Sequence, residues 1–243
     1  MILANARHQL SREDAQLAIR LVAGDSDDER DRGQQRLADE GIDAILDDSR
    51  LPAALLRHRL GAYTSLRLFL YVMVRHALMN AGERDKAVSD YLAAVLLAFA
   101  AKGRAERIGD ADDQLYDSLV DLLDEVNDRD PKRAFLVRVH LGNRALWVSG
   151  LFPDRIEQRK WKRGGPDLGY FEELGRRGFE LAAEHRIAEQ YGMAEVYAAV
   201  AARFGRLRVA LNTVSDTLFF PNVHTPERLM RQVNDEARWR LAG

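Results

Sequence analysis

The chain has 243 residues, of which 47% are hydrophobic and 30% charged, and its formal net charge is −2 at pH 7. This composition is that of an ordinary globular protein, and the small net charge excludes a strong general attraction to nucleic acid or anionic lipid. The absence of cysteine excludes disulfide scaffolds, thiol catalysis and cysteine-based zinc sites. The first residues carry no pattern of a secretory signal, so we expect a cytoplasmic location.

Helical signals dominate the first 60 residues. Ser11, which precedes Glu and Asp by two and three positions, is typical of the N-cap of a helix that reaches Val22. Asp25–Asp31 leads into a polar helix that Gly41 is expected to end. Pro52 suits the first turn of the helix that follows.

The stretch from Leu60 to Ala101 predicts two consecutive helices, joined by a turn at 80–82, that are apolar on almost all sides. Such helices are either buried against other helices or lie in lipid. Charged residues such as Arg75 and Lys102 argue against a membrane span. We therefore predict an all-α fold, a multi-helix bundle around a central buried antiparallel helix pair.

Helical patterns continue through the second half of the chain. The predicted elements are a helix that begins at Gly109 and Asp110, a helix over 131–150, a basic loop over 152–166, a helix from Asp167 to about Gly192, a helix over 193–219, and a closing helix from Thr225 and Pro226 to Leu241. No linker rich in Ser, Gly or Pro separates these elements. We expect one helical domain over 1–243, in which residues 1–50 could form a loosely packed N-terminal helical appendage.

His185 and Glu189 are the candidate catalytic residues. On the predicted helix over 167–192 they continue the apolar stripe that includes Gly178, and their spacing of four residues makes them neighbours. A His beside a carboxylate can act as a general base with its orienting group, or both can bind a metal ion. The alternative is a buried hydrogen-bonded pair near a helix end. Gly175 and Gly178 on the same face predict the close approach of another helix.

Four further residues are candidates for binding an anionic ligand. Arg67, Tyr71 and Arg75 are stacked on the one polar stripe of the first apolar helix, and Arg138 lies in the middle of the apolar arc of the helix over 131–150. Arginine suits bidentate contacts with carboxylate or phosphate groups. Internal salt bridges are the alternative for all three arginines. The acidic partners considered for Arg67 and Arg75 are Asp85, Asp90 and Asp117.

Three charged segments of the sequence are candidate motifs. The basic segment Arg155–Arg163, with Trp161 inside it, is either a solvated loop or a site for phosphate or nucleic acid. The segment Asp27–Asp31 resembles the DDxxD motif of isoprenoid synthases, and a second acidic cluster comprises Asp110, Asp112, Asp113 and Asp117. Both acidic segments lie at predicted helix starts, where Asp is favoured by capping and by the helix dipole.

The sequence therefore predicts a helical protein, without cofactor or metal, that binds a protein partner or a small anionic ligand. We expect no nucleic acid and no membrane partner. One alternative is a metal-independent enzyme in which His185 is the base and Glu189 its orienter. Another is a homodimeric scaffold protein, because helical proteins often bury remaining apolar stripes in dimers.

Overall fold

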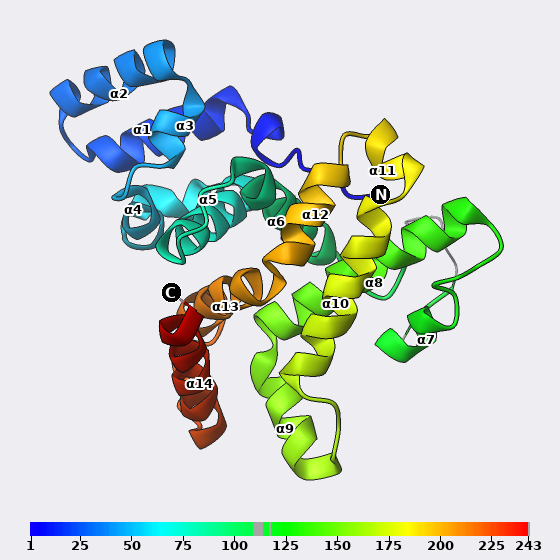
Figure 1. Cartoon of the computed structure of the whole chain (residues 1–243). Helices are drawn as coiled ribbons and strands as arrows, with labels where there is room; N and C mark the ends of the chain where they lie inside the picture. The colour runs from blue at the N-terminus through cyan, green and yellow to red at the C-terminus, as the bar shows by residue number, and fades with distance from the viewer. Residues whose placement is uncertain (109–113, 117, 243) are drawn as a thin grey trace. The chain divides into compact units, whose positions relative to one another are not determined.

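The computed structural model describes residues 1–108, 114–116 and 118–242, with the backbone alone for residues 238–242. Contact density divides the chain into two compact units, residues 2–100 and residues 101–243 together with Met1. In the part of the chain that the structure describes, all regular secondary structure is helical (Figure 1). The prediction of an all-α multi-helix bundle is confirmed, and the assignment of 1–243 to a single domain stays a prediction.

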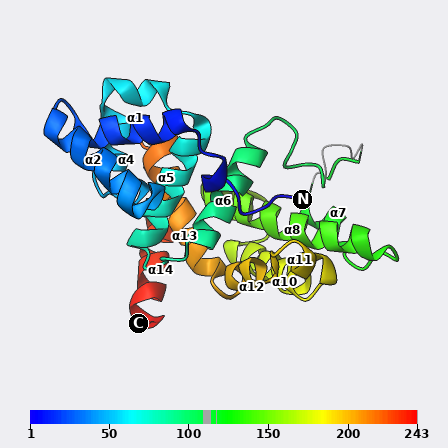
Figure 2. The same ribbon diagram turned by 90° about the horizontal axis from the view of Figure 1, so that it is seen from above.

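The N-terminal unit contains η1 (Arg7–Gln9), α1 (Arg12–Ala23), α2 (Asp27–Glu40), α3 (Ile42–Leu46), α4 (Leu51–Arg57), η2 (Arg59–Tyr63), α5 (Leu66–Asn80) and α6 (Lys86–Phe99). Helix α1 packs against α2, which lies beside it in both views (Figures 1 and 2). Ser11 caps α1 as predicted, because its hydroxyl accepts a hydrogen bond from the Asp14 N–H at 3.1 Å while the Asp14 carboxylate accepts one from the Ser11 N–H at 3.0 Å.

Helices α5 and α6 pack against each other and form the predicted buried pair. Every residue from Leu70 to His76 and from Val88 to Leu96 is buried. The turn between the helices includes Gly82, whose φ of 78° lies in the region that favours glycine. The burial of both helices on almost all sides confirms the prediction that rested on their missing polar faces.

The C-terminal unit contains α7 (Leu119–Leu123), α8 (Pro131–Leu151), α9 (Pro153–Arg163), α10 (Leu168–Ala183), α11 (Arg186–Gln190), α12 (Ala194–Ala202), α13 (Phe204–Val214), the π-helical turn η3 (Ser215–Phe219) and α14 (Pro226–Ala242). Helices α8 and α10 lie side by side (Figures 1 and 2). A Cβ atom on Gly178 would lie 2.8 Å from the carbonyl oxygen of Arg138, so only glycine permits this packing distance. The close approach predicted at Gly178 is confirmed.

Three predicted elements in this unit differ from the structure. The expected basic loop is the helix α9, which starts with Pro153 in its first turn and ends at Gly164 in the left-handed conformation. The helix expected to reach Gly192 ends at Ala183, because the chain turns to an extended conformation at His185. The helix expected over 193–219 is interrupted at Arg203.

The expected helix start at Gly109 and Asp110, and the acidic cluster of Asp110, Asp112, Asp113 and Asp117, lie outside the described residues. Asp27–Asp31 begins α2 behind the N-cap Ser26, as the capping interpretation predicts. Of the helices that the structure describes, none has both the length and the apolarity that crossing a bilayer requires.

Candidate functional site

The last helix, α14, is seated on the C-terminal unit by charged side chains. Its buried residues among 226–237 are Arg228, Arg231 and Asp235. At about 100° per residue these three positions share one face of the helix. The helix begins as predicted, because the Thr225 hydroxyl accepts a hydrogen bond from the Arg228 N–H at 3.2 Å and Pro226 occupies the first turn.

The arginines of α14 bind acidic residues of α9 and η3. Arg228 donates from Nε to Asp154 at 2.8 Å and from one terminal nitrogen to the carbonyl oxygen of Phe220 at 2.7 Å. Arg231 donates to both carboxylate oxygens of Asp216 at 2.8 and 2.9 Å, and to Asp154 at 3.3 Å. Both guanidinium groups are therefore held by charge-assisted hydrogen bonds away from solvent.

Asp235 of α14 reaches the most deeply buried arginine of the unit, Arg208 of α13, which is 1% exposed. Arg208 contacts Asp235 at 2.5 and 3.1 Å, Glu172 of α10 at 2.6 Å and the side-chain oxygen of Asn212 at 2.5 Å. Burial lowers the pKa of the Arg208 guanidinium, but the hydrogen bonds and charges of Asp235 and Glu172 together outweigh burial, and the pKa is raised. Arg208 thus stays charged while it joins three helices.

The opposite face of α14 is apolar and exposed. Leu229, Met230 and Val233 are 55%, 61% and 59% exposed, and Pro226 and Ala237 on the same face are also exposed. Surface helices of globular proteins ordinarily bury their apolar stripe and turn their charges to solvent. Helix α14 has the reverse orientation, so its apolar face is left open.

A cavity of about 700 Å³ lies beside α14 in the same unit. The lining residues are Glu157, Lys160, Trp161, Asp167, Leu168, Gly169, Arg208, Pro226, Glu227, Met230, Arg231, Asn234, Asp235 and Ala237. Arg231 is 5% exposed, and its Nε is a buried donor without a hydrogen-bond partner among the described residues. Glu157 and Glu227 make no ion pair with any described residue. Apolar surface, one unsatisfied donor and two unpaired carboxylates therefore meet in one cavity.

The ligand-binding residues predicted on α5 make contacts within the fold, and their ligand-binding role stays a prediction. Arg75 is buried and binds Asp47 through two hydrogen bonds of 2.8 and 3.0 Å. Tyr71 is buried, and burial raises the pKa of its hydroxyl. Arg67 donates to the carbonyl oxygen of Gln9 at 3.1 Å. The acidic partner of Arg75 is thus Asp47, which lies in a loop and was not among the acids considered from the sequence.

The remaining predicted ligand-binding residue, Arg138, is half-buried on α8. Its Nε donates to the carbonyl oxygen of Val126 at 3.0 Å, and one terminal nitrogen lies 3.4 Å from the side-chain oxygen of Asn127. Arg138 therefore ties the segment before α8 to the helix. The buried arginine of α8 is Arg144, which donates to the carbonyl oxygen of Tyr116.

His185 and Glu189 do not share the helical face on which their pairing was predicted. The His185 ring accepts a hydrogen bond at Nδ1 from the Ile187 N–H at 3.1 Å, which makes it the N-cap of α11. The ring also stacks on Phe135, with centroids 5.1 Å apart. Glu189 is exposed, and the described contacts of His185 do not include it. The structure does not bring the two together, and their catalytic role stays a prediction.

Sequence reasoning missed the residues that matter most here, Arg208, Arg231 and Asp235. The spacing of Arg228, Arg231 and Asp235 placed three charges on one face of the closing helix and was available as a signal. Their burial depends on Asp154, Glu172 and Asp216, which are distant in the sequence, so no local pattern could reveal it.

Within the described ranges, no group of three or more His, Asp or Glu side chains is arranged to hold a metal ion. Comparison of the chain with protein-family models, curated proteins and solved structures finds no match.

Proposed function

We propose that this protein binds a small organic carboxylate in the cavity of the C-terminal unit. The observation that carries the proposal is Arg231, which lines the cavity and whose Nε is a buried donor with no hydrogen-bond partner among the described residues. A buried donor left without an acceptor costs about 1–3 kcal/mol. An acceptor oxygen of a bound ligand would remove this cost, and a carboxylate is the acceptor that arginine matches best.

The surrounding charges favour a ligand with no more than one negative charge. Arg208, Arg228 and Arg231 are bound to four acidic groups, so the buried network has an excess of negative charge. The acidic groups of this network are Asp154, Glu172, Asp216 and Asp235. A phosphate dianion would be repelled there more strongly than a carboxylate, since repulsion grows with charge.

Other lining residues favour a ligand that also carries an ammonium group and an apolar body. Glu157 and Glu227, which make no ion pair with a described residue, offer carboxylates to a cation. Trp161, Leu168 and Met230 offer apolar surface, and the Trp161 ring can also attract a cation. These features together describe a zwitterion with an apolar side chain, as in a free hydrophobic amino acid.

Calorimetric titration with three compounds that share a phenyl ring tests the proposal. Phenylalanine carries both charges, phenylacetate only the negative one and phenethylamine only the positive one. We expect phenylalanine to bind most tightly and phenylacetate to bind measurably, with a matching rise in melting temperature, because a ligand of the native state stabilises it. Failure of both phenylalanine and phenylacetate to bind, whether or not phenethylamine binds, would overturn the proposal.

A conservative variant isolates the donor that carries the proposal. Arg231→Lys keeps the charge that faces Asp216 but removes the unsatisfied Nε. We expect phenylacetate to bind it about tenfold more weakly, the order of one charge-assisted hydrogen bond. Arg206→Lys, at an exposed position of α13, is the matched control and should bind like the wild type. Equal affinity of all three proteins would contradict the assignment.

No unsatisfied donor in a cavity supports the other functions that the sequence predicts, as far as the structure describes the chain. Catalysis by His185 with Glu189, a homodimeric scaffold and a cytoplasmic location stay predictions. The small anionic ligand expected at Arg67, Tyr71, Arg75 and Arg138 is replaced in this proposal by a ligand at Arg231, since the contacts of Arg75 and Arg138 hold the fold together.

A further inference from the structure

Helix α9 carries a concentration of cations that the proposed cavity does not use. Arg159, Lys162 and Arg163 are exposed, and none makes an ion pair with a described residue. Trp161 lies among them and is 73% exposed. Trp161 thus presents a large aromatic ring to solvent beside three cations.

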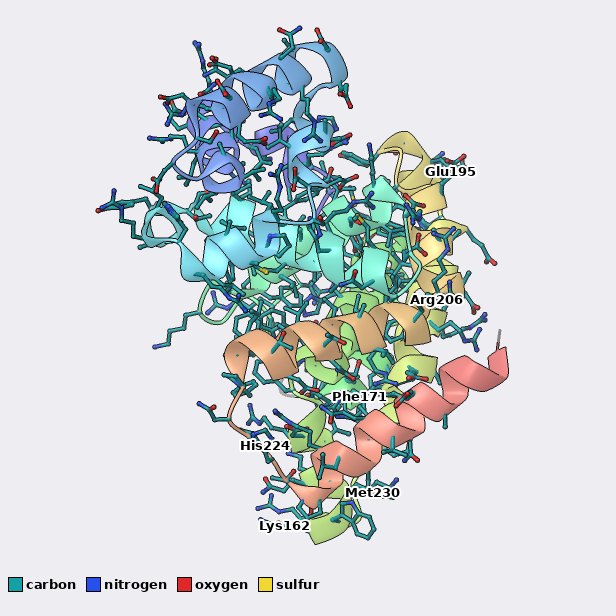
Figure 3. The ribbon with its side chains drawn as sticks, turned by 90° about the vertical axis from the view of Figure 1, so that its left-hand side faces the viewer. Lys162, Phe171, Glu195, Arg206, His224 and Met230 are labelled. Carbon is teal, nitrogen blue, oxygen red and sulfur yellow. The ribbon has the colours of Figure 1, made fainter. Side chains whose placement is uncertain are left out.

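The exposed apolar face of α14 lies at the same end of the unit. Helices α9 and α14 pack against each other, and Trp161 and Met230 line the same cavity. Figure 3 shows Lys162 of α9 and Met230 of α14 together at this end. We use the name α9–α14 surface for the cations Arg159, Lys162 and Arg163 together with Trp161, Leu229, Met230 and Val233.

We propose that the α9–α14 surface docks on an anionic lipid membrane. Peripheral binding requires apolar side chains that enter the boundary between headgroups and acyl chains, and cations that contact anionic headgroups. Leu229, Met230 and Val233 supply the first requirement, and the three exposed cations of α9 supply the second. Trp161 is of the residue type that prefers the interface itself.

The chemistry of the α9–α14 surface favours lipid over nucleic acid and over a second copy of the chain. Nucleic acid binding without sequence preference depends on aromatic rings on which bases stack, whereas three of the four large apolar residues here are aliphatic. A symmetric dimer through this surface would bring the α9 cations of both copies together, and their repulsion opposes it. An anionic membrane is complementary to both the apolar and the charged part.

This proposal departs from the expectation that the chain has no membrane partner. That expectation followed from the net charge of −2 of the whole chain and from the interrupted apolar helices, which concern a general attraction and a membrane span. A local surface can bind lipid whatever the total charge, because surface attraction acts within about a Debye length of roughly 8–10 Å.

Flotation with lipid vesicles tests the proposal on the full chain. We expect binding to vesicles of phosphatidylglycerol and phosphatidylcholine, weak binding to phosphatidylcholine alone, and loss of binding as NaCl is raised. In a variant with Trp147→Phe and Trp239→Phe, the fluorescence of Trp161 should shift to the blue on binding. Equal binding to neutral and anionic vesicles, or none at low salt, would overturn the proposal.

Matched variants separate this surface from charge in general. Replacing Arg159, Lys162 and Arg163 by Gln should lower the partition coefficient by about fivefold per charge removed. Replacing three exposed cations elsewhere in the unit, Arg129, Lys132 and Arg186, by Gln is the control and should leave it within about twofold. Leu229→Ser with Val233→Ser should abolish binding in a chain that still unfolds cooperatively. Equal losses in the two charge variants would contradict the proposal.

Two outcomes assign the surface to another partner and would also overturn the proposal. One is tighter binding to a single-stranded oligonucleotide than to anionic vesicles. The other is a dimer in solution, measured by light scattering, that Leu229→Ser with Val233→Ser converts to a monomer. Phenylalanine binding in the cavity is measured separately and does not depend on either result.

Discussion

Helices α5 and α14 both bury arginine, yet they differ in where their apolar side chains lie. Helix α5 buries apolar side chains almost all round and holds one buried arginine, Arg75, against Asp47. Helix α14 buries Arg228, Arg231 and Asp235 and exposes its apolar residues. The difference shows that an amphipathic pattern defines two faces but does not determine which one is buried. Acidic residues on neighbouring elements determine it in α14.

The largest expected effect comes from the arginine that holds α14 to the unit. Arg208→Met should lower the free energy of unfolding by about 3–5 kcal/mol, because it removes the buried cation that binds Glu172 and Asp235. Chemical denaturation measures this, with Arg206→Met at an exposed position of the same helix as the control. A loss below about 1 kcal/mol would show that apolar contacts, and not the buried charges, hold the helix.

Alanine substitution of one leucine in each helix tests whether the apolar side chains are buried in α5 and exposed in α14. Leu68→Ala in α5 removes a fully buried side chain and should cost about 2–5 kcal/mol. Leu229→Ala in α14 removes an exposed one and should change the free energy of unfolding by less than about 0.5 kcal/mol. Similar losses from both substitutions would mean that the apolar face of α14 is buried, contrary to its orientation here.

The smallest expected effect on stability concerns the ion pair of Asp48 and Arg50. Arg50 is exposed, unlike the buried arginines of α14. Hydrogen bonds from Arg50 lower the pKa of Asp48 to about 2, although partial burial opposes the shift. A carboxyl whose pKa is lowered on folding stabilises the fold above its unfolded pKa near 4 and loses this contribution as the pH falls toward 2. Because Arg50 is exposed and solvent screens the pair, we expect the contribution to be about 1 kcal/mol.

Denaturation between pH 4 and pH 2 checks this expectation. Asp48→Asn should lack the part of the acid sensitivity that comes from Asp48, whereas Asp25→Asn, at an exposed loop position, should keep the wild-type profile. If Asp48→Asn loses stability on acidification as steeply as the wild type, the pair with Arg50 contributes nothing measurable.

Much of the fold could be predicted because its causes are local. The cap at Ser11, the start of α14 at Thr225 and the close approach at Gly178 each depend on a few neighbouring residues. The burial of α5 and α6 follows from their composition alone. Helix ends are harder to predict from local patterns. The extended backbone at His185 divides a segment whose hydrophobic periodicity predicts one continuous helix.

The candidate site could not be predicted because its contacts join distant segments. Arg208 meets Glu172 and Asp235, which lie 36 and 27 residues away, and Arg228 meets Asp154 across 74 residues. Periodicity identifies a charged face but contains no information about such partners. Arg75 and Arg138 were predicted to bind a ligand because they lie on apolar helices. The cavity lies beside Arg231, on the charged face of α14, for which the sequence predicted no role.

The orientation of α14 is the central claim, and single cysteines in this cysteine-free chain test it directly. Leu229→Cys and Val233→Cys should react with a maleimide in the folded protein at rates close to those of the unfolded chain. Ala93→Cys and Ala182→Cys, at buried positions of α6 and α10, should be strongly protected. Protection of the two α14 thiols to the same degree as these buried ones would contradict the account.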